Sequence, residues 1–368
     1  MSNFLDNAIK LYPNRSHVPI ADNVPFINSA EVTGEEGYPV RVHRAANLTE
    51  VQADALVSVQ PTTSTPANIN GAQVDFKPQN VIDRFDHAYL KITFVNNDVA
   101  ACTLTPSPFL LNYWQIYGGN GNNLLFQQYG YELWNEIVTY SNTLEWNIMQ
   151  YLVGSNANYS TAGVTIAAGG STSLYIPLAS VFMSSRIFLQ GLNDNMLIRF
   201  TFQPSTQNLI SGVTPTVTNM QLLLRGCYEP QAVRDLKMKM YKQLPLDFPY
   251  LGVQRSQYTQ SIAANGNYKI QLQGINGLVS HLWIWAYLNP TTASTVGSFA
   301  DIWSTYDITE QNGNSILGYY VRDVADTTNF RSDNQISWME YADNQYSLNK
   351  NVLFVSVTRD PGGDFRNG

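Results

Sequence analysis

The acidic residues that could do chemistry are few, and one group of them lies among aromatic side chains. Asp301, Asp307 and Glu310 fall close to Trp303 and Tyr306 in the sequence. Two carboxylates across a cleft are what a glycoside hydrolase requires, and carboxylates beside aromatic rings also suit a sugar or a metal ion. We treat Asp301, Trp303 and Asp307 as an alternative ligand cluster and not as the main interpretation.

Two further carboxylate patterns resemble catalytic groups without completing them. Asp83, Asp86 and His87 are triad-like, but no serine stands in a nucleophile-elbow context, and Asp86 more simply caps a strand. Glu132 and Glu136 are four residues apart, on what we expect to be the polar face of a helix. A solvated surface explains this pair better than acid–base catalysis does.

Metal and phosphate motifs are incomplete as well. None of the histidines is spaced as part of a ligand pair; they are His17, His43, His87 and His281. The glycine-rich run 118–121 lacks the Lys-Ser/Thr of a phosphate loop, so it predicts a turn. The sequence therefore predicts no catalytic residue, no metal and no cofactor, and a protein that is not an enzyme.

The composition fits a β-rich protein whose surface carries little charge. Charged residues make up 13% of the 368 residues, about half the usual share. Interface cores are depleted in charge, so this balance fits a surface covered by neighbouring subunits, although an ordinary secreted β-protein remains an alternative. The net charge of −7 and the lack of a Lys/Arg cluster argue against direct nucleic-acid binding. We expect Cys102 and Cys227 to be free and buried.

The N-terminal segment lacks the features of a signal peptide. Residues 2–13 contain Asp6 and have neither a basic start nor a continuous apolar core. No apolar span long enough to cross a membrane follows. A short helix is predicted over 2–11, and its apolar side would contact either a neighbouring subunit or lipid. That side includes Phe4, Leu5 and Ile9.

The elements that must position these residues are mostly strands. After a loop-like stretch at 15–78, with a first short strand at 74–76, strands are predicted at 87–95, 109–117, 124–128, 163–167, 172–178, 185–189, 196–202 and 220–225. We expect 163–167 and 172–178 to form a hairpin. Together these segments supply the strands of one closed sandwich. A lone helix set inside such a run of strands points to an architectural protein rather than to a catalyst.

One amphipathic helix is predicted inside this run of strands, over 131–152. Its apolar residues recur at three- and four-residue steps and define a buried stripe. The stripe consists of Leu133, Ile137, Tyr140, Leu144, Ile148 and Tyr151.

The second half repeats the same class of elements after a change in composition. A helix is predicted at 230–243, and strands at 268–272, 278–287, 318–321 and 352–357. The predicted domains are an N-terminal arm and extended leader at 1–70, a first barrel at 71–228, a helical linker at 229–260 and a second barrel at 261–368.

Three stretches of this order resemble a known family. Residues 74–97 are similar to the opening strands of the tectivirus type of major capsid protein. Residues 108–142, with Trp134 early in the helix, resemble the strand, turn, strand and helix of the same type. Residues 165–178 resemble the next hairpin. The chain thus resembles the double jelly-roll major capsid proteins of tailless icosahedral double-stranded DNA viruses, which include tectiviruses and adenoviruses. One departure is that only residues 358–368 follow the last predicted strand.

This resemblance implies a mainly β fold of two jelly-roll barrels, and a structural function in the virion. Three chains would form a pseudo-hexagonal homotrimer that tiles a shell, usually over an internal membrane. Partners would be neighbouring capsid trimers, minor capsid or penton proteins, and possible internal lipid, with synthesis in the host cytoplasm. The alternatives are a carbohydrate- or receptor-binding β-sandwich, such as a spike or lectin, and a glycoside hydrolase.

Overall fold

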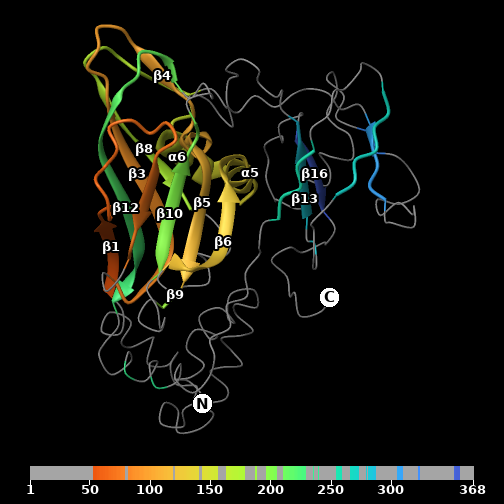
Figure 1. Cartoon of the computed structure of the whole chain (residues 1–368), viewed down its shortest axis with the longest axis horizontal. Helices are drawn as coiled ribbons and strands as arrows, with labels where there is room; N and C mark the ends of the chain where they lie inside the picture. Colours follow the sequence, from red (N-terminus) through yellow and green to blue (C-terminus); the bar gives the residue numbers. More distant parts are fainter. Residues whose placement is uncertain are drawn as a thin grey trace.

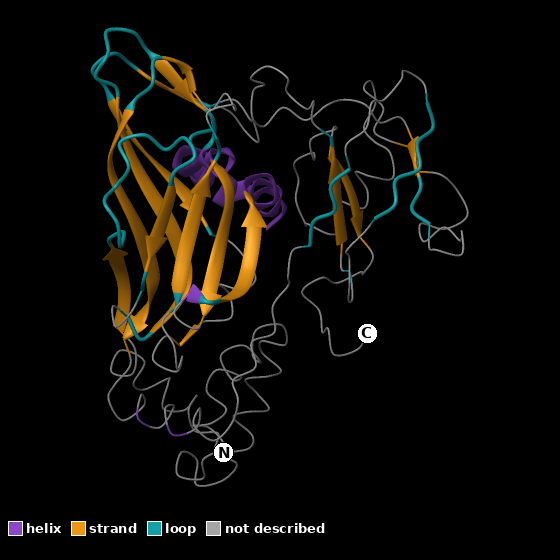
Figure 2. Cartoon of the chain, in the orientation of Figure 1, coloured by secondary structure: helices purple, strands orange, loops and turns teal. Residues whose placement is uncertain are grey.

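The first half of the chain folds into a β-sandwich in this computed structural model (Figure 1, Figure 2). The structure describes residues 53–78, 82–118, 121–140, 143–155, 163–178, 187–188, 196–204, 210–228, 235, 239, 254–258, 266–272, 279, 281–286, 305–309, 322–323 and 352–356.

Two antiparallel sheets face each other in this sandwich. The first has the order β1-β12-β3-β8, with β9 also paired to β3, and the second has the order β2-β10-β5-β6. The first sheet comprises β1 (Ala53–Val59), β12 (Thr216–Tyr228), β3 (Arg84–Val95), β8 (Ser171–Pro177) and β9 (Ile187–Phe188). The second comprises β2 (Gln73–Phe76), β10 (Leu197–Phe202), β5 (Leu111–Gly118) and β6 (Asn123–Tyr129).

The connectivity of these strands is that of a jelly roll. Among the described strands of the sandwich, the chain crosses from one sheet to the other at most steps, and β5 and β6 are consecutive strands that pair with each other. The first strand, β1, pairs with the last, β12, along its whole length. Such nested crossing brings strands from distant parts of the sequence side by side, as the two Greek keys of a jelly roll do.

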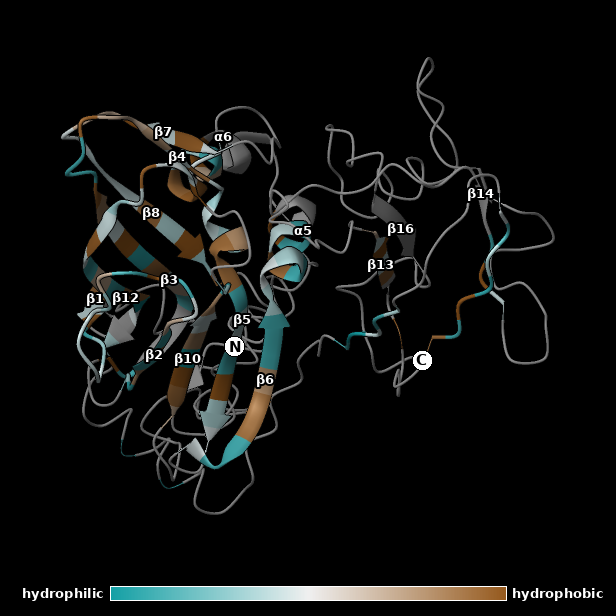
Figure 3. Ribbon diagram, turned by 45° about the horizontal axis from the view of Figure 1, so that its top comes forward, coloured by the Kyte–Doolittle hydropathy of each residue, from teal (hydrophilic) through white to brown (hydrophobic). Residues whose placement is uncertain are grey.

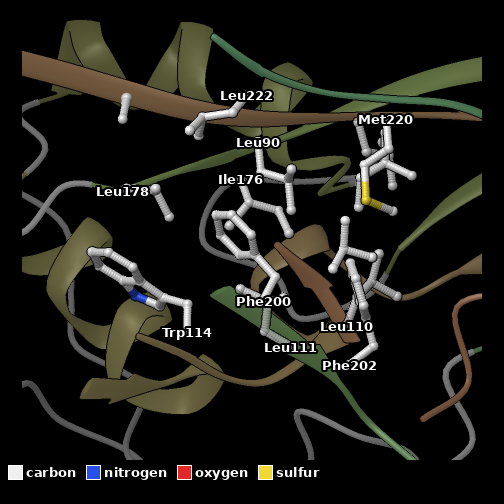
Figure 4. Packing of buried hydrophobic residues seen from close by; sticks show 14 of the residues in the cluster. Leu90, Leu110, Leu111, Trp114, Ile176, Leu178, Phe200, Phe202, Met220 and Leu222 are labelled. Carbon is white, nitrogen blue, oxygen red and sulfur yellow. The ribbon is translucent and has the colours of Figure 1, made fainter. Parts of the chain in front are cut away.

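The core lies between the two sheets and follows the two-residue period of the strands. Ala88, Leu90, Ile92 and Phe94 alternate along β3 and are all buried. The same alternation of hydrophobic and hydrophilic residues is visible along the strands in Figure 3. Side chains from the first sheet point toward those of the second in Figure 4, where Leu90, Ile176 and Leu222 are opposite Leu111, Trp114, Phe200 and Phe202.

A small third sheet lies at one end of the barrel, and it shows that the hairpin predicted for 163–167 and 172–178 is wrong. It has the order β11-β4-β7 and joins β4 (Cys102–Leu104), β7 (Val164–Ile166) and β11 (Ile210–Gly212). Although β7 and β8 are joined by a tight turn at Gly169, they do not pair, because β7 pairs with β4 and β8 pairs with β3. The local pattern showed the turn correctly, whereas the pairing depended on distant strands. Cys102 is free and buried, as predicted.

The prediction of a single helix over 131–152 is wrong, because the described residues of this stretch form two helices. They are α5 (Gly130–Tyr140) and α6 (Thr143–Val153). Helix α5 packs on β5, β6 and the short 3-10 helix η1 (Ser107–Leu110), whereas α6 packs on β8. The predicted stripe is therefore divided, with Leu133 and Ile137 buried in α5 but Ile148 and Tyr151 67% and 77% exposed on α6.

The starts of two other predicted elements also differ. The stretch 15–78 is not all loop, since it contains β1, whose position beside β12 makes it part of the first barrel. The strand predicted at 109–117 begins only at Leu111, because the preceding residues form η1. Hydrophobic residues in η1 are buried as fully as in a strand, which is why composition alone did not separate the two.

The described strands of the second half form two short pairs. β13 (His281–Trp285) pairs with β16 (Val352–Ser356), and β14 (Thr305–Tyr306) pairs with β15 (Arg322–Asp323). The strand predicted at 268–272 is absent, because these residues are described outside any strand. Of the predicted helix at 230–243, Asp235 and Lys239 are described, and both are helical. The strand predicted at 318–321 lies outside the described residues.

Candidate functional site

The residues predicted to bind a ligand or a membrane fall mostly outside the described part of the chain. Phe4, Leu5 and Ile9 are outside it, as are Asp301 and Trp303. Asp307 is described and exposed, directly after β14. Both sets of residues therefore stay predictions.

Within the described ranges, no group of three or more His, Cys, Asp or Glu side chains could hold a metal ion. Of the triad-like residues, Asp83 is buried whereas His87 is exposed, so these two side chains lie in different surroundings. Among the residues described, no helix is both long and apolar enough to span a bilayer.

The corner where β6 turns into α5 carries the most unusual set of polar contacts. We call residues 129–132 the β6–α5 corner. Gly130 permits the turn, because a Cβ atom there would lie 2.3 Å from the carbonyl oxygen of Pro108 and 2.4 Å from that of Leu111. Only glycine lets the backbone of α5 approach η1 and β5 this closely. The corner thus places the first turn of α5 against the barrel wall.

A buried hydrogen-bond network supports the corner from inside the barrel. The indole Nε1–H of Trp114 donates to Oε1 of Gln128 at 2.9 Å, and Nε2 of Gln128 donates to Oε2 of Glu136. All three residues are buried, and they belong to β5, β6 and α5. Buried polar groups need such partners, and satisfied networks fix relative positions. The expectation that Glu136 is solvated is therefore wrong.

Glu132 is buried as well, and it caps the helix. Its Oε2 accepts the backbone N–H of Tyr129 at 2.8 Å. Tyr129 directly precedes α5 and Glu132 is the third helical residue, so this is the glutamate half of a capping box. Burial raises the pKa of Glu132 from 4.5 to about 7, against the opposing effects of the Tyr129 hydrogen bond and of the Arg255 charge. The prediction of a solvated Glu132 is also wrong, since only 3% of it is exposed.

Two segments of the second half meet this corner. The guanidinium of Arg255 lies over the Tyr129 ring, 4.2 Å from its centroid. The Trp285 ring stacks on Tyr131, with centroids 6.4 Å apart and planes 17° apart. Trp285 and Trp283 also pack against the hydrophobic core of the barrel. Alternate residues of one corner thus hold two segments that are separated from it by more than a hundred residues.

The aromatic rings of the corner are themselves held by the barrel. Tyr113 of β5 contacts the Tyr129 ring edge-to-face, with centroids 5.8 Å apart. Phe109 of η1 contacts the Tyr131 ring at 5.3 Å. Such aromatic pairs contribute roughly 0.5–1.5 kcal/mol beyond the area that they bury. The corner therefore presents positioned ring faces to Arg255 and Trp285.

The outer face of the second sheet is polar, and its groups pair with one another. Arg199 on β10 makes two hydrogen bonds to Asp75 on β2, at 2.8 and 2.9 Å, and lies over the Tyr117 ring. Gln115 on β5 donates to Gln127 on β6 at 2.6 Å and accepts from Tyr117 at 2.9 Å. This face holds amide, aromatic and ionic groups in mutual contact across four strands.

Sequence reasoning missed most of the corner. One signal was available, since a glutamate at the third helical position is a capping-box signature. Arg255 and Trp285 gave no local signal, because their partners are distant in sequence. Gln128 likewise looked like an ordinary residue of an alternating strand.

The sequence matches no protein-family model and no curated protein. Among solved structures, the chain is similar to one in a quasi-atomic model of the PBCV-1 virus capsid, with 14% identity and a TM-score of 0.59 over 85% of this chain and 79% of that chain. It is also similar to PBCV-1 VP54, fitted into a cryo-EM reconstruction of the virophage Sputnik. That match has 15% identity and a TM-score of 0.56, over 85% of this chain and 80% of that chain.

The fold is that of the double jelly-roll major capsid proteins. This confirms the predicted fold class, and the strand order of the first barrel agrees with it independently. Because the match covers 85% of the chain, the double jelly-roll likeness extends beyond the first barrel. At these identities the likeness concerns the fold, and function needs a separate argument.

Proposed function

We propose that this protein is the major capsid subunit of an icosahedral double-stranded DNA virus, with a structural and not an enzymatic role. The observation that carries the proposal is the jelly-roll strand order of the first barrel, together with the match of 85% of the chain to PBCV-1 capsid structures. The two results are of different kinds, since one comes from pairing within this chain and the other from comparison.

The construction of the barrel supports repeated packing of copies. A free edge of a sheet can pair with another chain, so proteins that crowd together protect their edges. β6 is an edge strand of the second sheet, and its pairing with β5 is interrupted by a bulge between Ile116 and Tyr117. Bulges twist an edge away from a flat pairing surface. The low share of charged residues fits side-to-side contacts between subunits.

In this proposal the assembling unit is a homotrimer of pseudo-hexagonal outline, made of two barrels from each chain. Neighbouring trimers, minor capsid or penton proteins, and an internal membrane would be its partners. Three copies of the 41.2 kDa chain would have a mass of 123.6 kDa. The division into arm, first barrel, linker and second barrel belongs to the same proposal.

Native mass and imaging test the proposal together. The purified protein should have the trimer mass, and electron microscopy should show six barrels around a threefold axis. A protein that stays monomeric at high concentration, and that forms neither trimers nor sheets of trimers, would contradict the capsid function.

The carbohydrate-binding alternative has a specific place on the molecule to be tested. The outer face of the second sheet carries Tyr113, Tyr117 and Gln115, residue types that sugar-binding sandwiches use. However, Arg199 covers the Tyr117 ring, and the Gln115 side chain is engaged by Gln127 and Tyr117. Saturable binding of a glycan that is lost in Tyr117→Ala would favour this alternative over the shell.

A further inference from the structure

The β6–α5 corner combines a buried acid with a cation that comes from another part of the chain. Arg255 reaches the corner from the segment 254–258, while Glu132 belongs to α5 of the first barrel. Glu132 holds the backbone N–H of Tyr129, and Arg255 covers the ring of the same residue. Tyr129 thus contacts both groups, the Glu132 carboxylate through its backbone N–H and the Arg255 guanidinium through its ring.

The electrostatic surroundings of Glu132 are simple among the described residues. Arg255 is the cation that acts on it. On its own helix, Glu136 lies one turn further, where Gln128 donates a hydrogen bond to it. From β6 and β5 the titratable groups are the phenols of Tyr129 and Tyr113, which contact each other edge-to-face. Among the described residues, Arg255 is therefore the charged group that acts on Glu132.

We propose that the β6–α5 corner is a charge-gated joint between the two halves of the chain, in which ionised Glu132 holds Arg255 on the Tyr129 ring and protonation of Glu132 releases it. The second contact, Tyr131 with Trp285, is uncharged and keeps the halves together when Arg255 leaves. The joint then loosens at the segment 254–258 without separating completely. These contacts are within one chain, so the proposal does not depend on shell assembly.

The direction of the pH effect follows from reciprocity between two binding events. The charge of Arg255 lowers the pKa of Glu132, so ionisation of Glu132 must strengthen the docking of Arg255 to the same extent. Burial brings the pKa of Glu132 to about 7, which places the transition near neutral pH. Glu132 stays covered by the barrel in both states, because its helix packs on η1, β5 and β6. Acidification through this range therefore releases Arg255.

Hydrogen–deuterium exchange of the intact protein measures the joint directly. Protection of the segment 254–258, corrected for the intrinsic exchange rate at each pH, should fall about fivefold or more between about pH 8.5 and about pH 5.5. In Glu132→Gln the same segment should show, at every pH, the low protection that the wild type shows at about pH 5.5. Protection in the wild type that stays constant, or that rises on acidification, would overturn the proposal.

Two arginine variants keep the test decisive if Glu132→Gln does not fold. Arg255→Met preserves the length of a half-exposed side chain and removes its charge, so protection of 254–258 should become low and independent of pH. Arg225→Met removes an exposed arginine of β12 and should leave the wild-type pH profile unchanged. A wild-type profile in Arg255→Met would show that the charge of Arg255 does not gate the joint.

Discussion

The two helices that replaced one predicted helix provide a sharp test of the packing. Ile137 and Ile148 belong to the same predicted stripe, yet Ile137 is 1% exposed in α5 and Ile148 is 67% exposed in α6. Replacement of either residue by alanine removes the same atoms. The difference between the two variants therefore measures burial alone, since the helix propensities change equally.

The magnitude for Ile137→Ala follows from its position in the core. Isoleucine loses roughly three carbon groups, each worth about 0.8 kcal/mol when buried, which gives about 2.4 kcal/mol. Residual cavity formation between α5 and the barrel adds to this, so we expect a loss of about 2–5 kcal/mol of unfolding free energy. The matched change, Ile148→Ala, should cost less than about 0.5 kcal/mol, as exposed substitutions usually do.

Denaturant unfolding of both variants, followed by far-ultraviolet circular dichroism, measures the two losses against the wild type. Multidomain chains can unfold in stages. The unfolding transition of the first barrel in each variant should therefore be compared with the same transition in the wild type. Equal losses for the two variants would contradict the division of the stripe. A negligible loss for Ile137→Ala would mean that α5 is not packed on the core.

Three further predictions follow from single residues. Because burial raises the pKa of Glu132 to about 7, the folded state binds its proton more tightly than the unfolded chain, and the stability it contributes below pH 4.5 is lost as the pH rises through 7. This contribution amounts to about 3 kcal/mol at most. In Glu132→Gln the melting temperature should depend less on pH between about pH 5 and about pH 8 than it does in the wild type. The same pH dependence in both proteins would show that Glu132 is solvated. Gly130→Ala should destabilise the first barrel by more than about 2 kcal/mol, because the new Cβ atom meets backbone carbonyls that cannot move freely; calorimetry that finds the variant as stable as the wild type would refute the close approach. Ile9→Asp should weaken liposome binding or particle assembly while trimers stay intact, and unaffected assembly, measured by light scattering, would remove the membrane role of the N-terminal face.

Global unfolding and the release of Arg255 from the β6–α5 corner should depend on pH in opposite directions. Unfolding returns Glu132 to water, so burial dominates and acid favours the folded state. Release of Arg255 leaves Glu132 covered, so only the favourable charge interaction is lost and acid favours release. Measurement of both in the same samples therefore distinguishes the two effects.

Strand identity was largely readable from the sequence, because it depends on a local pattern. The alternation of Leu90, Ile92 and Phe94 places β3 correctly, and the aromatic run before the glycine turn places most of β5. The pattern failed at Ser107–Leu110, where a buried 3-10 helix has the same composition as a strand. It also missed β1, whose short apolar stretch lies among prolines.

The candidate site was much less predictable, for a physical reason. Glu132 and Glu136 occupy positions that are polar in any local pattern, and only the packing around α5 decides that they are buried. Their partners lie on other elements, with Gln128 on β6 and Arg255 far along the chain. A helical period indicates which residues share a face, but not how many of the faces are covered.

The amino-acid sequence by itself determined the class of this protein: β-rich, low in charge, without a catalytic or metal motif, and ordered like a jelly-roll capsid subunit. The β-rich class follows from composition and from periods of two and of three to four residues, which act over short distances along the chain, whereas the likeness to a capsid subunit rests on a resemblance in the order of the segments. Only the tertiary structure decided which strands pair, where the helix divides, and that Tyr129 contacts both Glu132 and Arg255. Pairing in a jelly roll joins residues separated by more than a hundred positions, and no local pattern carries that information.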